Sequence, residues 1–156
     1  MPRIFVAIPI PAQVATALDR LLPPLPSLRR VAPELMHVTL AFIGQVGEER
    51  VADVTAAVGV AALASGPVPV DLSTVGSFPE HGLPRLVWAG SGPRAAAAIV
   101  RIGASVRAEL LRHRVPFDPK PLRAPVTIAR VREEASAEAA RAIAAAVTAA
   151  RLGREL

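Results

Sequence analysis

The sequence predicts an α+β domain in which helices cover two mainly antiparallel sheets. Its apolar patterning indicates strands and helices in turn, with no glycine-rich dinucleotide fingerprint and no regular βαβ rhythm. One short pattern, Val-Thr followed by Leu or Ile and then Ala, occurs once in each half of the chain. With 156 residues, 52% of them hydrophobic and 20% charged, the chain is long enough to bury one core. We therefore expect residues 1–156 to form a single domain with two lobes.

The first half predicts two pairs of a strand and a helix. Residues 4–7 form a short apolar run typical of a strand, and residues 11–22 read as a helix with proline in its first turn. Residues 36–43 are expected to be extended, and a glycine-bounded turn over 44–47 follows them. An apolar stripe at helical spacing predicts a helix over 48–64. The opening segment is therefore expected to be a strand and not a signal peptide, with a cytoplasmic location for the protein.

The second half predicts a hairpin, a long helix, a strand and a final helix. Alternating residues over 68–76 indicate an extended segment that pairs with 85–89 in an antiparallel hairpin. Apolar residues in helical phase predict a helix over 93–113. A proline-rich stretch then leads into a strand over 126–131. The last helix is predicted over 136–151, with Ser136 as its N-cap.

The repeated pattern predicts two related strands. Residues 37–42 read HVTLAF, and residues 125–130 read PVTIAR, about half the chain apart. If the two halves are a degenerate duplication, these strands are expected to face each other across a central cleft. Residues two apart on a strand project to the same face, so His37 and Thr39 point together while the residues between them turn to the core.

A histidine and a threonine on one strand face can serve phosphodiester chemistry. An imidazole gives or takes a proton near neutral pH, and a neighbouring hydroxyl can hold an oxygen of the group under attack. Two such units would place a metal-free acid and base on either side of one phosphorus. A single His-x-Thr also occurs in ordinary strands whose histidine has only a structural role, so the motif alone leaves that reading open.

Several blocks together resemble one protein family. They are MPRIFVAIPIP at the start, RRVAPELMHVTLAFIGQV around the first motif, VDLSTVGSFP followed by PRLVWAG, and the late VTIARVR. In order and spacing these blocks resemble the two-histidine phosphoesterase superfamily, and within it the RNA 2′,3′-cyclic phosphodiesterases, also named 2′-5′ RNA ligases. The resemblance covers nearly all of residues 1–132. It implies a bilobal α+β fold with one His-x-Thr motif from each lobe at the cleft.

The resemblance also implies roles for individual residues. The substrate would be an RNA with a 2′,3′-cyclic phosphate end, or a cyclic nucleotide, hydrolysed to a 2′-phosphate with no metal and no cofactor. His37 is the expected proton donor to the leaving 3′ oxygen, while Thr39 and Thr127 are expected to hold the nonbridging phosphate oxygens. Arg130 would supply positive charge. Phe78 is expected either to line a nucleobase pocket or to be a buried aromatic residue.

Strict strand alternation complicates two of these positions. It places Arg130 on the face opposite Thr127, so the role of Arg130 requires the strand to end or twist there. Phe42 stands in the same relation to Thr39, and we expect Phe42 to lie in the core.

The second motif departs from the family at its first residue. The family has its second histidine, the proton acceptor, two residues before Thr127, and here Pro125 occupies that position without a side-chain donor or acceptor. His81, in a loop, and His113, at the end of a helix between two arginines, are poor substitutes. The sequence therefore predicts an impaired phosphodiesterase, with a catalytically inactive nucleotide or RNA-end binding protein as the alternative.

Composition narrows the partners further. The net charge is +5, and Lys120 is the only lysine among 18 basic residues. Guanidinium groups suit a phosphate partner, although an arginine-rich composition also arises from a GC-rich genome. The chain has no cysteine, and its three histidines lack the spacing of a zinc site. We expect neither a metal nor a membrane partner.

Two further expectations concern binding and assembly. Residues 44–47, GQVG, superficially match the loop of an RNA-binding module, but the few aromatic residues mostly read as core and not as base-stacking platforms. Members of the family usually continue past the final helix into another strand, whereas this sequence stops at Leu156. We expect a monomer whose second lobe lacks that strand, with association possible through the unpaired edge.

Overall fold

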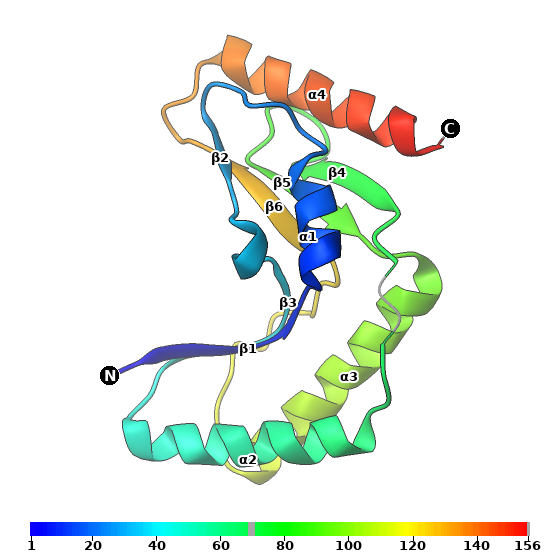
Figure 1. Cartoon of the computed structure of the whole chain (residues 1–156). Helices are drawn as coiled ribbons and strands as arrows, with labels where there is room; N and C mark the ends of the chain where they lie inside the picture. The colour runs from blue at the N-terminus through cyan, green and yellow to red at the C-terminus, as the bar shows by residue number, and fades with distance from the viewer. Residues whose placement is uncertain (69–70, 156) are drawn as a thin grey trace. The chain divides into compact units, whose positions relative to one another are not determined.

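The computed structural model describes residues 1–68 and 71–155, which form helices and two antiparallel sheets (Figure 1). The elements are β1 (Arg3–Pro9), α1 (Ala12–Asp19), β2 (Leu28–Arg30), a 3₁₀ turn (Pro33–Leu35), β3 (His37–Gln45), α2 (Glu48–Ala64), β4 (Thr74–Phe78), β5 (Leu86–Gly90), α3 (Pro93–Arg112), β6 (Val126–Val131) and α4 (Ala137–Glu155). The predicted α+β class with two antiparallel sheets is confirmed. Residues 69–70 of the predicted extended segment lie outside the described residues.

The chain divides into two compact units, each assembled from three segments. Unit 1 comprises Met1–Ile8, Val38–Val70 and Pro93–Ala124, and unit 2 comprises Pro9–His37, Asp71–Gly92 and Pro125–Leu156. The boundary passes through β3, directly after His37. That the chain forms a single domain, and that its two lobes face each other across a cleft, remain predictions.

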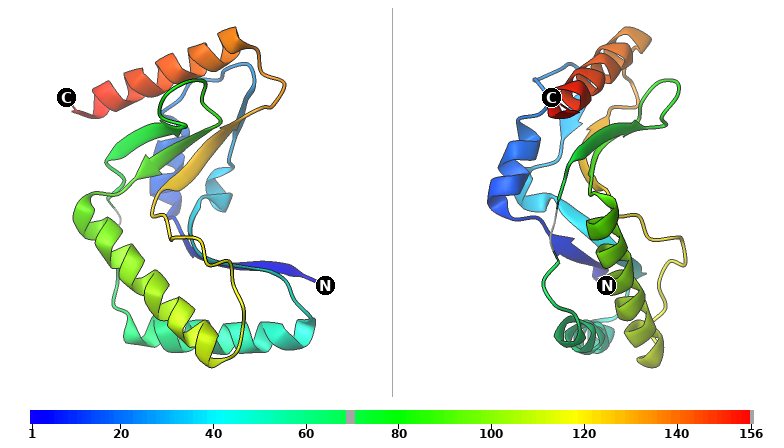
Figure 2. Two further views of the ribbon diagram at one scale, coloured as in Figure 1. Left: turned by 180° about the vertical axis from the view of Figure 1, so that it is seen from behind. Right: turned by 90° about the vertical axis from the view of Figure 1, so that its right-hand side faces the viewer.

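Unit 1 combines the ribbon of β1 and β3 with the helices α2 and α3 (Figure 2). The two helices pack against each other, and α3 buries the apolar positions that its helical phase predicts, including Ile99, Val106 and Leu110. Gly103 lies within this buried stripe. The lack of a side chain there admits Leu122, since a Cβ atom at residue 103 would overlap Cδ1 of Leu122. The proline-rich segment after α3 is thereby packed onto the helix.

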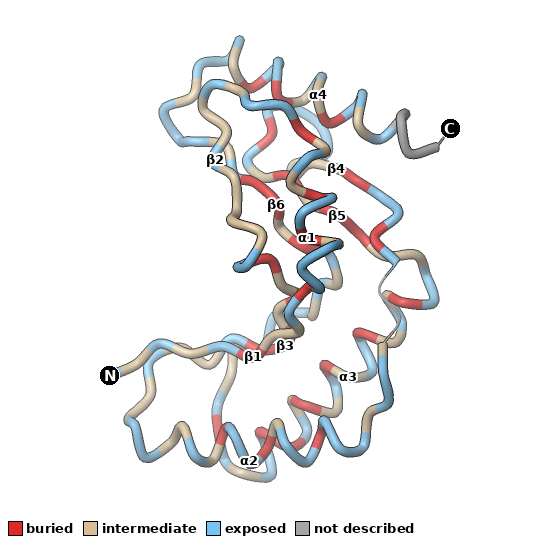
Figure 3. Tube along the Cα trace, in the orientation of Figure 1, coloured by how far each residue is buried: buried red, intermediate tan, exposed pale blue. Residues whose placement is uncertain are grey.

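Unit 2 contains a four-stranded sheet in the order β2-β6-β5-β4, and α4 packs against β4. Buried residues recur along β4, β5 and β6, as the trace coloured by burial shows (Figure 3), and strand register places most of them on one face of the sheet. The buried residues that register assigns to this face are Val75, Val87, Ala89, Val126 and Ala129. The predicted antiparallel hairpin is confirmed, since β4 and β5 pair from Thr74 opposite Gly90 to Phe78 opposite Leu86, but its first strand begins at Thr74 and not at residue 68. The other face carries the candidate site.

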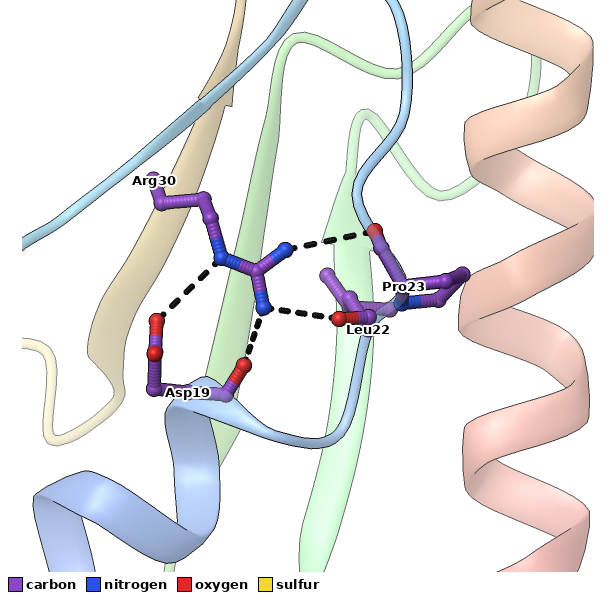
Figure 4. A network of polar contacts seen from close by, with 4 residues as sticks. All are labelled: Asp19, Leu22, Pro23 and Arg30. Carbon is purple, nitrogen blue, oxygen red and sulfur yellow. Dashed lines mark hydrogen bonds and ion pairs between the residues drawn. The ribbon is translucent and has the colours of Figure 1, made fainter.

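Helix α1 ends at Asp19, three residues before the predicted end (Figure 4). The guanidinium of Arg30 binds the C-terminal end of α1 and the residues that follow it. Its Nε donates to Asp19 Oδ1 at 3.2 Å, and its Nη2 donates to the backbone oxygens of Asp19 and Leu22. Its Nη1 donates to the Pro23 oxygen at 3.2 Å. Carbonyls that a longer helix would use internally are thus bonded to Arg30 of β2. The network fixes α1 to the edge strand.

The last helix begins as predicted. The Ser136 hydroxyl accepts a hydrogen bond from the Ala139 amide at 3.0 Å, which is the N-cap geometry expected for serine. Helix α4 then continues to Glu155, beyond the predicted end at residue 151.

Candidate functional site

The two repeat segments share one burial pattern. Over residues 38–42 the side chains are buried, half-buried, buried, buried and exposed, and residues 126–130 follow the same order. The first residue of each repeat is not buried, being half-buried at His37 and exposed at Pro125. The likeness in sequence is therefore also a likeness in burial, including two successive buried residues that break regular alternation.

The cause of that break is visible in β6 as a β-bulge. Trp88 of β5 pairs with Thr127, and the residue before it, Val87, pairs with Ala129. Ile128 therefore lacks a separate partner on β5, and one extra residue is inserted in β6. Ile128 and Ala129 are both buried, at 3% and 1% exposure, as expected where a bulge reverses the alternation.

The bulge brings Arg130 to the same face as Thr127. Thr127 pairs with Trp88 and Arg130 pairs with Leu86, and these two residues of β5 are two apart, so they share a face. The expectation from strict alternation, which put Arg130 on the opposite face, was wrong because it assumed a regular strand.

We call this surface the Thr127 face. Strand register assigns to it Arg29 of β2, Thr127 and Arg130 of β6, Leu86 and Trp88 of β5, and Thr74, Gly76 and Phe78 of β4. Phe78 is 48% exposed, so the alternative of a buried aromatic residue was wrong. The face thus combines hydroxyl, guanidinium and aromatic groups on one sheet.

Two arginines stand directly opposite each other on the Thr127 face. Arg29 of β2 pairs with Arg130 of β6, and both side chains are exposed. Like charges directly opposite on antiparallel strands repel each other. An anion bound between the two guanidinium groups would remove this repulsion and could accept hydrogen bonds from both. The pair places two positive charges side by side on the Thr127 face.

His37 is oriented by the backbone that leads into β3. Its Nδ1 lies 2.7 Å from the Leu35 carbonyl oxygen, and because a carbonyl can only accept, Nδ1 carries a hydrogen. The predicted alternation holds here, since Val38 and Leu40 are 0% and 3% exposed while His37 and Thr39 are half-buried.

The expectation that Phe42 lies in the core was wrong. Its side chain is 57% exposed, and its ring lies 6.1 Å from the ring of Phe5, centroid to centroid, with a tilt of 42°. Leu40 and Ala41 are buried in succession, so the residue after them returns to the exposed side. Phe5, Phe42 and Phe78 are all exposed, which also overturns the expectation that the aromatic residues are mostly core.

The two remaining histidines, His81 and His113, lie outside both repeat segments. His81 is exposed in the loop between β4 and β5, and His113 follows α3, where its Nδ1 bonds the Glu109 carbonyl at 2.8 Å. Pro125 is exposed and directly precedes β6. Among the side chains that the structure describes, in residues 1–68 and 71–151, no group of three or more histidine, aspartate or glutamate residues is placed to hold a metal ion. In the same ranges, no helix has the length and apolar character needed to cross a membrane.

The sequence analysis names Thr127, Arg130 and Phe78 of the Thr127 face but neither Arg29 nor Trp88, which carry its other charged and aromatic groups. The signal for Trp88 is a pair of glycines, Gly76 and Gly90, inside strands, where glycine marks close approach of another group. The signal for Arg29 requires the register of β2 against β6, which the sequence alone does not give.

Comparison with known proteins gives a consistent family. A sequence model of the family described as LigT like Phosphoesterase matches residues 8–88. The RNA 2′,3′-cyclic phosphodiesterase of Archaeoglobus fulgidus is 30% identical over 135 residues, which cover 85% of this chain and 74% of that protein. The protein of the same name from Thermus thermophilus is 32% identical over 137 residues, covering 82% and 68% of the two chains.

Solved structures agree with this assignment. A crystal structure of a protein from Thermus thermophilus superposes with a TM-score of 0.69 at 29% identity, covering 86% of this chain and 77% of that one. Escherichia coli LigT in complex with 3′-AMP has the same fold, with a TM-score of 0.63 at 22% identity over 86% and 76% of the two chains. By its sequence and its fold, the chain belongs to the LigT-like phosphoesterases, the family of the RNA 2′,3′-cyclic phosphodiesterases.

Proposed function

We propose that this protein binds 2′,3′-cyclic phosphate ends of RNA, or cyclic nucleotides, and hydrolyses them slowly to 2′-phosphates without a metal ion. The observation that carries the proposal is the β-bulge, which brings the Thr127 hydroxyl and the Arg130 guanidinium to one face. A hydroxyl and a planar guanidinium are both suitable donors to the nonbridging oxygens of a phosphate. The names of the relatives from Archaeoglobus and Thermus support the same substrate.

The leaving group requires an acid, and His37 is the proposed donor. Water attacks the phosphorus, the bond from phosphorus to the 3′ oxygen breaks, and the proton on Nε2 of His37 passes to that oxygen. The hydrogen bond from Nδ1 to the Leu35 carbonyl supports this role, because it fixes the orientation of the imidazole ring. Thr39, on the same strand face, and Thr127 are the proposed partners of the nonbridging oxygens.

The charge that develops on the phosphate requires nearby cations. Arg130 is the proposed first cation, and Arg29, directly opposite it, adds a second guanidinium to the same face. Fixed donors that already point to the charged group need no rearrangement during the reaction, which is the basis of electrostatic stabilisation. The repulsion within the arginine pair in the empty state favours binding of the anion.

The attacking water has no histidine to take its proton, because Pro125 occupies the base position of the second motif. In this proposal the proton passes to solvent, at a cost of about 10²–10⁴-fold in rate. The same observation favours a second candidate function, a nucleotide or RNA-end binding protein without turnover. Loss of the base removes none of the phosphate-binding groups, so binding is expected under either function.

Phosphorus NMR of adenosine 2′,3′-cyclic phosphate incubated with the protein tests the proposal. We expect slow conversion to the 2′-phosphate, unchanged by EDTA and abolished by His37→Ala. A 3′-phosphate product, or activity that EDTA removes, would contradict the mechanism. Binding of the 2′-phosphate in calorimetry without any turnover would select the binding function, and absence of both would refute the proposed substrate.

A further inference from the structure

The indole of Trp88 lies flat over a glycine of the neighbouring strand. A Cβ atom built on Gly76, which pairs with Trp88, would overlap Cζ2 of the indole and stand 2.8 Å from Cε2 and 2.9 Å from Cη2. If the ring met this position with its edge, the two flanking atoms would be much farther away than the nearest one. The nearly equal distances therefore place the face of the six-membered ring over Gly76.

A second glycine, Gly90, also leaves room for the indole ring of Trp88. A Cβ atom on Gly90 would lie 3.0 Å from Cζ3 of Trp88 and 2.8 Å from Oγ1 of Thr74. Side chains at Gly76 and Gly90 would thus displace the indole, and glycine at both positions allows its close approach. Trp88 itself is half-buried, as expected for a ring that has one face covered by β4.

The position of the ring relates it to the proposed phosphate site. Trp88 pairs directly with Thr127, and side chains at such positions start about 4.5–5.5 Å apart. From there the indole extends over β4, away from β6, and Phe78 lies farther along β4 on the same face. A nucleotide whose phosphate is held by Thr127 and Arg130 would have its base beside the indole.

We infer that Trp88 is a stacking platform for the nucleobase of the bound nucleotide, an inference that rests on the proposed function. A flat indole gives affinity for any base, because every base has a π-face, and it gives little selection among them. The competing explanation is that the ring only covers a glycine in an edge strand and stabilises the sheet. The two explanations differ in what happens to ligand affinity when the ring is changed.

Trp88 is the single tryptophan of the chain, so its fluorescence reports on this position alone. We expect adenosine 2′-monophosphate to quench the emission with a saturable curve. Ribose 5-phosphate should bind in calorimetry through its phosphate group alone. Its affinity should be weaker than that of adenosine 2′-monophosphate, and it should cause little quenching. Equal affinity for the two ligands and no quenching would overturn the platform and leave the phosphate site intact. Failure of both ligands to bind would refute the proposed function together with the platform.

Variants separate stacking from packing. Trp88→Leu should weaken binding of adenosine 2′-monophosphate by roughly 5- to 150-fold and leave the affinity for ribose 5-phosphate unchanged, whereas Trp88→Phe should restore most of the loss. Gly76→Ala keeps the tryptophan but displaces its ring, so quenching should fall. Gly59→Ala is the matched control, because a Cβ atom at Gly59 meets nothing within 4 Å. With folding checked by circular dichroism, a Trp88→Leu protein that binds both ligands like the parent would refute the platform.

Discussion

Returning a histidine to the second motif should raise the turnover of this protein. The change is Pro125→His, at the position that corresponds to His37 in the shared burial pattern. Pro125 is exposed and precedes the first residue of β6, so a larger polar side chain there displaces no core residue. Thr127, two residues later, keeps its place in the sheet opposite Trp88.

The expected gain follows from what is added. One general base contributes roughly 10²–10⁴-fold in rate, which corresponds to about 3–5 kcal/mol of barrier. The phosphate-binding groups are unchanged, so KM should move much less than kcat. Removing a proline frees the unfolded chain and costs about 0.4–1 kcal/mol of stability. This loss is small beside the catalytic gain, and the variant is expected to remain folded.

The assay is initial-rate hydrolysis of adenosine 2′,3′-cyclic phosphate by the parent and by Pro125→His, across pH. The rate of the variant should follow a bell-shaped curve, because one imidazole must be neutral and the other protonated. Adding His37→Ala should remove the gain. A folded Pro125→His protein with the turnover of the parent would show that position 125 does not correspond to the family's second histidine.

Three further outcomes are expected. The double change Thr39→Val with Thr127→Val should abolish the heat of binding of a 2′-nucleotide at low salt, and equal binding would show that these hydroxyls do not hold the phosphate. Arg30→Met should lower the free energy of unfolding by about 1–2 kcal/mol in urea denaturation, because carbonyls at the end of α1 lose their donor at a site that is only partly buried. Gly103→Val should cost about 1–3 kcal/mol in the same assay, since its side chain would overlap Leu122 and force repacking of α3; an unchanged midpoint would contradict this packing.

Much of the fold follows from local patterns in the sequence. The helix over 48–64 and the strand over 126–131 match the structure residue for residue. Apolar spacing indicates both elements, glycine or proline flanks both ends of the helix, and Pro125 marks the start of the strand. Ser136 was identified as an N-cap for the same reason, since the capping bond involves only its near neighbours. The end of α1 was not predictable in this way, because it depends on Arg30, a residue distant in the chain.

The arrangement of the candidate site depends on non-local pairing. The motif itself identifies Thr127, but whether Arg130 shares its face depends on the bulge at Ile128, which is defined by the partner strand. Phe42 was assigned to the core for the same reason, because alternation was assumed to continue past two successive buried residues. The indole of Trp88 can lie over β4 because the residue paired with it is Gly76. The sequence alone does not show which residues pair across strands.

The matching burial of the two repeats separates the residues that build the strand from those that decide its chemistry. The buried positions are filled by Val, Leu, Ile and Ala in both copies, whereas the positions that differ in chemical character are His37 against Pro125 and Phe42 against Arg130. These four side chains are at least partly exposed, so exchanging them leaves the buried apolar residues around each strand unaltered. In evolution, such a strand can acquire or discard a reactive group by one substitution near the surface, and the ancestral scaffold persists through the change.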